Sequence, residues 1–238
     1  MPDFTYTPAV NQIVTAECCG GSGQGHGDNG GATPGGGGGG GAYARRASIH
    51  LTAGIHYLVR VGAPFNVAAP HESLFVSNLV VQADFGTGAP FAGFGSGGLA
   101  SSSTGDFTSN GGNGVWVGGP FPGGGGGARG GRGGAGSPGT VPIGGSNSEG
   151  DLGGDGGALN QVGFPGPGGG GGGGGADGGT RAGGVGTEGY VIVWADADYP
   201  FGAVAPRPGA TPIITYGTLP PGYLTPISPK TRRSAFIS

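Results

Sequence analysis

Three unbroken runs of glycine, at residues 35–41, 123–127 and 168–175, restrict what this chain can fold into more than any other feature. A glycine loses more backbone entropy on folding than any other residue, and it brings no side chain to a hydrophobic core. Glycine fills 66 of the 238 positions, so a core of packed side chains cannot order these runs. Two outcomes are open: the runs stay flexible as linkers, or their peptide groups hydrogen-bond to one another in an ordered array.

Glycine chains can adopt extended helices with three residues per turn, and without Cβ atoms such helices can approach closely enough to exchange hydrogen bonds. In that conformation residues 168–175 would span about 25 Å, at about 3.1 Å per residue. No strict Gly-X-Y repeat is present, so a collagen triple helix is excluded. Strand-forming segments stand at both ends of the glycine-rich region, at residues 13–19 and 190–194. These two strand-forming segments favour the ordered array, because the glycine runs between them would be loops that return to one sheet.

Residues 48–62 carry the clearest strand pattern in the sequence. A three-residue loop at residues 52–54 predicts a hairpin in which His50 faces His56, with Gly54 in the left-handed conformation that the loop needs. This register places six apolar side chains on one face: Ile49, Leu51, Ile55, Tyr57, Val59 and Val61.

Residues 73–84 add one or two further strands, and no segment has an apolar period typical of a helix. The sequence therefore predicts a mainly β and irregular fold. We expect a frame of short β-strands with packed polyglycine II helices and no long α-helix.

Composition divides the chain into three parts. We expect an extended N-terminal arm at residues 1–12, a glycine-rich β and polyglycine domain at 13–198, and a proline-rich basic C-terminal arm at 199–238. The last part contains no acidic residue, and its basic residues are the candidates for an assembly arm: Arg207, Lys230, Arg232 and Arg233. The alternative is that this segment is a disordered tail. An assembly arm would differ from it by becoming ordered when it binds a neighbour.

The formal net charge is −3 and only 10% of residues are charged, which is low for a disordered chain. No apolar stretch is long enough to span a membrane, and we expect no signal peptide and no membrane insertion. Cys18 and Cys19 are adjacent, so in a strand their side chains point to opposite faces. We interpret them as small buried hydrophobic residues in a reducing compartment.

The sequence contains no catalytic pattern that we can identify. A phosphate-binding loop needs Gly-Lys-Ser/Thr, and Lys230, the one lysine, lies in the proline-rich tail. His50 and His56 are weak metal candidates, because two ligands are too few for a site on their own. A calcium-binding repeat near the acidic residues Glu149, Asp151 and Asp155 fails at Ala158. We therefore predict no enzyme activity, no cofactor and no metal.

The segment Arg129-Gly-Gly-Arg132 is similar to the arginine-glycine boxes of RNA-binding tails. Such boxes normally recur in strongly basic tails, whereas this one is single and lies in an acidic body. We therefore expect no nucleic acid partner, and we place both arginines on helix edges that face solvent.

Aromatic residues gather in the loop-like stretch 85–122. Loops on a rigid frame often carry recognition, and exposed aromatic rings bind sugars or protein surfaces. The alternative is that these rings cover the ends of the glycine array or pack on a neighbouring subunit. The candidate recognition residues are Phe85, Phe91, Phe94, Phe107, Trp116 and Phe121.

The order of these segments resembles the glycine-rich domain of tailed-bacteriophage virion proteins of the tail-fibre or minor tail type, a sandwich of polyglycine helices. The matching pieces are a strand that ends in Gly-Gly, a glycine run that ends in Gly-Ala-Tyr-Ala, a hairpin, a Ser-Leu-Phe strand, a second glycine region and a final Gly-Tyr-Val-Ile-Val strand. They occupy residues 14–21, 35–44, 49–62, 73–76, 168–175 and 189–193.

The resemblance implies a structural component of a tailed-phage virion, made in the host cytoplasm, most simply a tail, baseplate or fibre protein. Expected partners are other virion subunits in a homo- or hetero-oligomer, with a host cell-surface receptor as a further expectation. A capsid decoration or head-fibre protein would use the same parts. Alternatives of another class are an extracellular glycine-rich matrix protein and an RNA-binding arginine-glycine protein.

Overall fold

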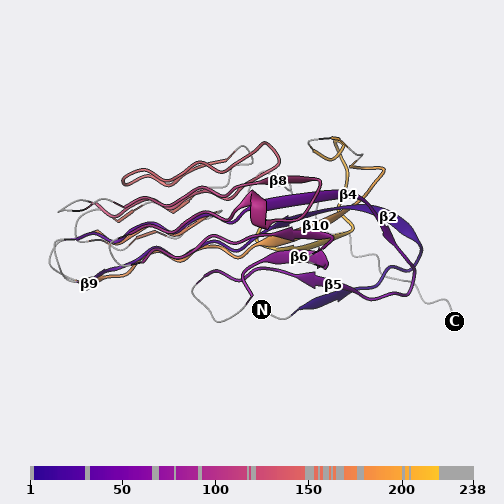
Figure 1. Cartoon of the computed structure of the whole chain (residues 1–238), viewed down its shortest axis with the longest axis horizontal. Coiled ribbons are helices and arrows are strands. Elements are labelled where there is room, and N and C mark those ends of the chain that lie inside the picture. Colours follow the sequence, from indigo (N-terminus) through magenta and orange to yellow (C-terminus); the bar gives the residue numbers. More distant parts are fainter. Residues whose placement is uncertain are drawn as a thin grey trace.

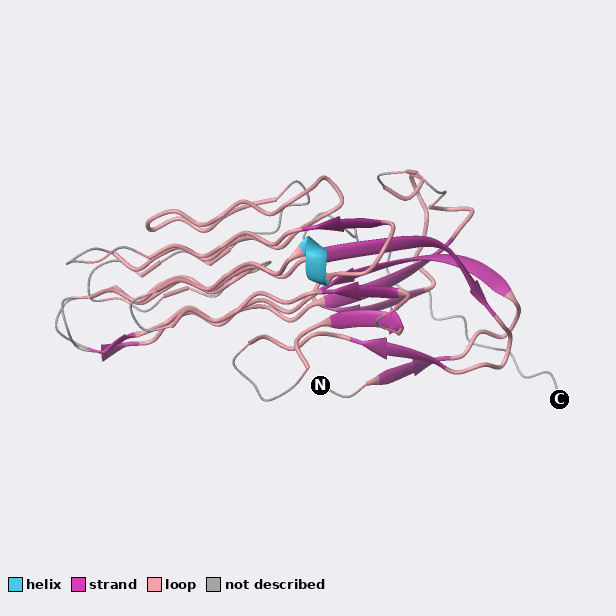
Figure 2. Cartoon of the chain, in the orientation of Figure 1, coloured by secondary structure: helices cyan, strands magenta, loops and turns pink. Residues whose placement is uncertain are grey.

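The strands of this protein form a β-sandwich, and a bundle of extended glycine helices continues the sandwich at one end (Figure 1). The computed structural model describes residues 3–29, 33–65, 70–77, 79–90, 93–116, 118, 122–147, 153–154, 156–157, 161, 163–164, 169–175, 180–199, 202–203 and 205–219. The mainly β fold without a long α-helix is confirmed, and the described helical structure is the short 3₁₀ helix η1 (Ala100–Ser102) (Figure 2).

Each sheet of the sandwich is antiparallel throughout. The four-stranded sheet has the order β1 (Phe4–Tyr6), β5 (Tyr57–Arg60), β6 (Ser73–Val76), β7 (Val81–Ala83). The five-stranded sheet has the order β11 (Ile214–Gly217), β10 (Tyr190–Ala195), β2 (Gln12–Cys19), β4 (Tyr43–Leu51), β8 (Phe107–Ser109). A separate pair, β3 (Asp28–Asn29) and β9 (Thr180–Arg181), closes the far end of the bundle.

The hydrophobic core lies between the two sheets and alternates along β2 as a half-buried strand requires. Val14, Ala16 and Cys18 belong to this core, whereas Cys19 belongs to a second apolar cluster on the outer face of the five-stranded sheet. The prediction that Cys18 and Cys19 point to opposite faces is confirmed. Both cysteines are buried and free of disulfide bonds.

The predicted hairpin at residues 48–62 is wrong. β4 pairs with β2 and β8, while β5 pairs with β1 and β6, so the chain crosses from one sheet to the other between them. The apolar alternation was real, but it marks two strands that face the same core from opposite sides. Ile55, in the crossing loop, is 51% exposed, and Gly54 has the expected left-handed φ of 75°.

Each of the two segments predicted as terminal arms contains a strand of the sandwich. β1 is an edge strand of the four-stranded sheet, and β11 is an edge strand of the five-stranded sheet. Phe4 and Tyr216 stack with ring centroids 4.6 Å apart, which joins these two edges. Phe4, Tyr6, Ile214 and Tyr216 pack against the apolar core, so residues beyond both predicted boundaries, at 12 and 198, contribute to it.

The glycine runs form the ordered array rather than flexible linkers. In the helix of residues 35–41, the N–H groups of Gly35 and Gly38 donate to Gly174 and Gly171. Gly37 and Gly40 donate in the same way to another neighbour, at Val115 and Gly112. Positions three residues apart thus meet the same neighbour, which is the period of polyglycine II.

The helix of residues 35–41 is the centre of a hexagonal bundle. Its peptide groups bond to six surrounding segments: residues 20–26, 84–87, 95–98, 112–115, 124–130 and 171–174. Consecutive segments of this ring also bond to one another, as in Gly86 to Gly21, Thr87 to Ser96, Gly114 to Gly95, Val115 to Gly125, Gly173 to Gly124 and Gly171 to Gly23. The ring therefore closes around the central helix.

Close backbone approach explains why these positions are glycine. A Cβ atom on Gly38 would lie 2.2 Å from the carbonyl oxygen of Gly23. At the edge of the bundle the requirement falls to every third residue: Gly183, Gly186 and Gly189 face the helix of residues 20–26, with Cβ positions 2.0–2.4 Å from carbonyl oxygens. Val185, between them, is 50% exposed.

Gly38→Ala should destabilise the protein strongly, by about 3 kcal/mol or more, because the neighbouring backbone at residues 23–24 would have to move to admit one methyl group. Thermal unfolding followed by circular dichroism measures the loss. Gly88→Ala is the matched control, since its Cβ would meet its nearest atom at 3.4 Å. Equal melting temperatures for the two variants would contradict the close-packed bundle.

Candidate functional site

A buried carboxylate stands where the bundle meets the sandwich. Glu17, in β2, has no exposed surface and lies on the outer face of the five-stranded sheet. The Arg132 guanidinium binds it in a bidentate pair, Nε to Oε1 and Nη2 to Oε2, each at 2.6 Å. Further hydrogen bonds to this carboxylate come from the side chains of Tyr43, Trp194 and Tyr199. Both oxygens are therefore engaged in holding the structure together.

Arg129, three residues before Arg132 in the sequence, also links the bundle to the sandwich. Its side chain is fully buried, and Nη1 donates to the carbonyl oxygens of Glu188 at 3.1 Å and Thr218 at 3.0 Å. The guanidinium lies 5.2 Å from the ring centroid of Tyr190, a cation–π distance. This one side chain thus joins a ring helix of the bundle to the segments that flank β10 and β11.

The prediction that Arg129 and Arg132 face solvent is therefore wrong. The side chain of Arg132 is 13% exposed, and its guanidinium lies 5.6 Å from the ring centroid of Tyr199. The physical reason is the buried charge of Glu17, which needs a partner and obtains one from the glycine-rich segment. A lone carboxylate inside the apolar strand at residues 13–19 was the signal that the sequence offered and that our prediction missed.

The two histidine candidates are not paired. His50 lies in β4 opposite Ile13 of β2, and Nδ1 of His56 lies 2.6 Å from Oγ1 of Thr7. Their predicted pairing depended on the hairpin, which does not form. Within the described part of the chain, no three histidine, cysteine, aspartate or glutamate side chains gather in a way that could hold a metal ion. The acidic residues Glu149, Asp151 and Asp155 lie outside the described residues.

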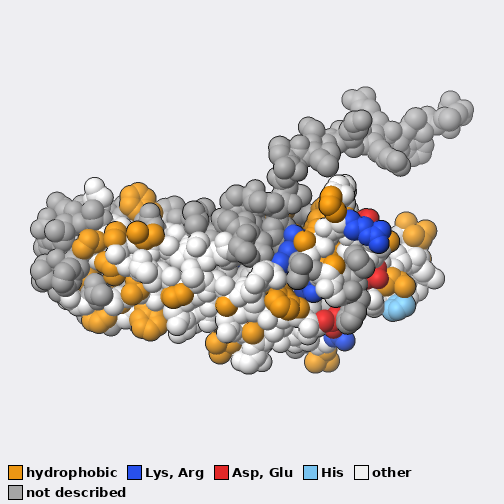
Figure 3. All heavy atoms as spheres, turned by 90° about the horizontal axis from the view of Figure 1, so that it is seen from above, with side chains coloured by type: hydrophobic (Ala, Val, Ile, Leu, Met, Phe, Trp, Pro, Cys, Tyr) orange, Lys and Arg blue, Asp and Glu red, His pale blue; other side chains and the backbone are white. Residues whose placement is uncertain are grey.

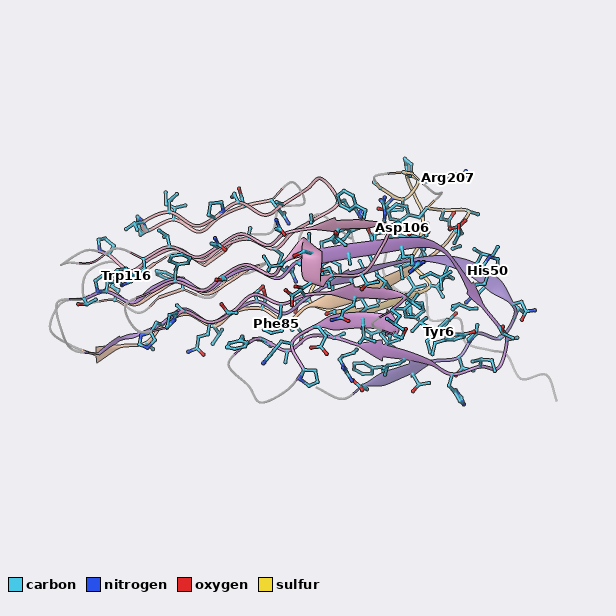
Figure 4. The ribbon with its side chains drawn as sticks, viewed as in Figure 1. Tyr6, His50, Phe85, Asp106, Trp116 and Arg207 are labelled. Carbon is cyan, nitrogen blue, oxygen red and sulfur yellow. The ribbon has the colours of Figure 1, made fainter. Side chains whose placement is uncertain are left out.

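The aromatic candidates lie in different places. Phe85 joins a cluster with Phe65 and His71, its ring stacked 5.6 Å from that of Phe65. The indole of Trp116 donates to the carbonyl oxygen of Pro34 much farther along the bundle (Figure 4). The two rings therefore do not share one surface.

The remaining aromatic candidates divide between packing and exposure. Phe107 packs against Tyr43 and Arg45 at the junction, so it serves the alternative role of packing. Phe94 is 47% exposed on the bundle. Phe91 and Phe121 lie outside the described residues. Among the described candidates, Phe94 alone is a largely exposed ring.

Of the assembly-arm candidates, only Arg207 is described. It is exposed, and its N–H donates to the carbonyl oxygen of Asp198 at 2.7 Å. Figure 4 shows it above the sandwich, away from the bundle. Lys230, Arg232 and Arg233 lie outside the described residues.

The two halves of the molecule present different surfaces. On the face shown in Figure 3, the described charged side chains gather over the sandwich, while the bundle shows backbone and apolar side chains. The largely exposed apolar side chains of the bundle include Phe94, Ile143, Phe164 and Val185. On this face, backbone and apolar side chains of the bundle thus contrast with a charged sandwich.

No protein-family model matches the chain, and no curated protein matches it in sequence. In the portion that the structure describes, there is no apolar helix of a length that could cross a bilayer.

Arg132→Met should lower the free energy of unfolding by about 3–5 kcal/mol, because it leaves the buried Glu17 carboxylate without its cation. Adding Glu17→Gln should restore part of that loss, since a neutral amide is less costly to bury. Urea unfolding of the single and double variants measures both effects. A double variant less stable than Arg132→Met alone would contradict the coupling.

Alkaline pH should weaken the same junction. Burial, with the neighbouring Glu17 carboxylate, raises the pKa of Tyr199 from 10 to about 12 and that of Tyr43 well above its ordinary value. The folded state thus binds these protons more tightly, so its stability is complete below pH 10 and falls as the pH rises from 10 through 12. The expected slope is up to about 1.4 kcal/mol per pH unit for each tyrosine.

Urea unfolding across this pH range, with the ultraviolet absorbance of tyrosinate in the native protein, measures the effect. If all seven tyrosines of the native protein ionised together near pH 10, the buried junction would be contradicted.

Proposed function

We propose that this protein is a structural component of a tailed-phage virion, in the first place a tail, baseplate or fibre protein. The observation that carries the proposal is the hexagonal bundle, in which the central helix bonds to six neighbours along its length. Such a bundle is a stiff rod without a conventional core, a form suited to a particle component that projects from its base. The resemblance of the segment order to virion glycine-rich domains supports the same conclusion.

The two ends of the molecule suit different tasks. On the face shown in Figure 3 the sandwich carries the described charged side chains, and its edge strands β1 and β11 offer surface for neighbouring subunits. The bundle carries exposed apolar side chains such as Phe94, which suit contact with a host surface. The rod then holds these side chains away from the particle.

The alternative functions differ in how well the structure suits them. A capsid decoration or head-fibre protein would need the same rod, and only its place in the particle differs. A glycine-rich matrix protein would also profit from such a rod. An RNA-binding arginine-glycine protein needs accessible guanidinium groups, and those of Arg129 and Arg132 are held at the junction.

Immunogold electron microscopy of particles assembled with a tagged copy of this chain should place the label on the tail, baseplate or fibres. Label on the head would support the decoration alternative instead. Particles that carry no label, with the protein left in the lysate, would overturn the proposal.

Host contact has its own readout in the same particles. Phe94→Ala should slow adsorption to cells, whereas the control Leu79→Ala, which removes a 79% exposed side chain from the β6–β7 turn of the sandwich, should not. Equal adsorption rates for the two variants would contradict a role of the Phe94 side chain in host contact.

A further inference from the structure

An open groove of about 500 Å³ runs along one side of the bundle. One wall is the ring helix at residues 24–27, and the other is formed by residues 88–90 together with Phe65. Phe65 is 40% exposed and stacks on Phe85, so an apolar ring lies at the proximal end of the groove.

The groove stands where the hexagonal array would continue, and the described residues do not fill this row. In the helix of residues 20–26, every third N–H points the same way: Gly20, Gly23 and His26 all donate to the central helix. The N–H of Gly21 points outward and donates to His71, in the segment that connects β5 to β6. The equivalent groups three and six residues later belong to Gln24 and Gly27.

Neither of those two N–H groups has a hydrogen-bond partner among the described residues. Among the described residues, none continues beside Gln24 and Gly27 the row that His71 occupies beside Gly21. The two donors are separated by about 9 Å, three residues at about 3.1 Å each, which matches the carbonyl spacing of another chain in the same conformation.

Gly88 keeps this row open. A Cβ atom there would meet Phe65 Cδ1 at 3.4 Å and the carbonyl oxygen of Gln24 at 3.5 Å, which are ordinary contacts. By contrast, a Cβ atom on Gly86 would lie 2.2 Å from the carbonyl oxygen of Gly39. The bundle itself therefore requires glycine at residue 86 but not at residue 88, where its effect is to leave the groove free of a side chain.

We propose that the groove binds a proline-rich segment in extended conformation, residues 220–229 of a second copy of this chain. Proline favours the polyproline II conformation, which has the same three-residue period as polyglycine II, and its carbonyl group accepts hydrogen bonds although it has no N–H. The groove supplies what such a chain needs, two outward donors and the Phe65 ring. The prolines of this segment are Pro220, Pro221, Pro226 and Pro229.

The position of Leu219 favours a second copy over the chain's own tail. Leu219 packs against the cluster on the outer face of the five-stranded sheet. The groove lies beside the β5–β6 connection, which belongs to the other sheet. The inference concerns self-association and does not depend on the proposed virion function.

A fluorescent synthetic peptide of residues 220–229, titrated with the full-length protein and followed by anisotropy, tests the proposal. We expect saturable binding that Gly88→Trp weakens at least about tenfold, because the indole fills the row. Gly118→Trp is the matched control. It places the same side chain at another open glycine, where the nearest described atom to a Cβ belongs to the Trp116 ring, at 3.5 Å, and it should bind the peptide as the wild type does.

Two further measurements complete the test. A peptide with its four prolines replaced by alanine should bind wild-type protein at least about tenfold more weakly, which requires no altered protein. In sedimentation velocity, the wild-type chain should associate as its concentration rises, and Gly88→Trp should stay monomeric. Absence of peptide binding, unchanged binding by Gly88→Trp, or a wild-type chain that stays monomeric would each overturn the proposal.

Discussion

Hydrogen bonding between bare peptide groups is the interaction on which this structure depends. In most proteins the entropy lost by the backbone is offset by buried side chains, but the central helix has none to bury. For the central helix, the lost backbone entropy is offset by hydrogen bonds, because its polar backbone groups find partners in six surrounding segments. Those segments come from distant parts of the chain, so no helix of the bundle can form alone, and its order depends on assembly of the whole array.

The sandwich is what brings these segments into register. β2 runs directly into the ring helix of residues 20–26, and the central helix runs directly into β4. Antiparallel pairing of β2 with β4 thereby sets two glycine segments side by side before they reach the bundle. Arg129 and Arg132 then bind the glycine-rich segment to the outer face of the same sheet. The buried Glu17–Arg132 pair is geometrically exacting, so it specifies one docking position more than it adds stability.

The strands and the glycine array could be predicted from sequence, but their connections could not. The apolar runs at residues 13–19 and 190–194 match β2 and β10 closely, since both are buried and rich in strand-forming residues. The hairpin prediction was wrong because alternation shows which side chains face a core, but does not show whether two strands share a sheet. The arginines were misplaced because the general preference of charged groups for solvent gives way when a buried carboxylate lacks a partner.

Glycine spacing carries more information about position in the bundle than we used. A helix surrounded on all sides needs glycine at every residue, as at residues 35–41, whereas an edge helix needs it only where it faces a neighbour, as at Gly183, Gly186 and Gly189. The number of glycines in each three-residue turn therefore reflects how many sides of a helix face close neighbours. It follows that outward positions such as Val185 can change freely without disturbing the array. In such a rod, hydrogen bonds between backbone groups stabilise the fold, while the side chains of the edge helices form the surface. The surface can therefore vary independently of the interactions that hold the rod together.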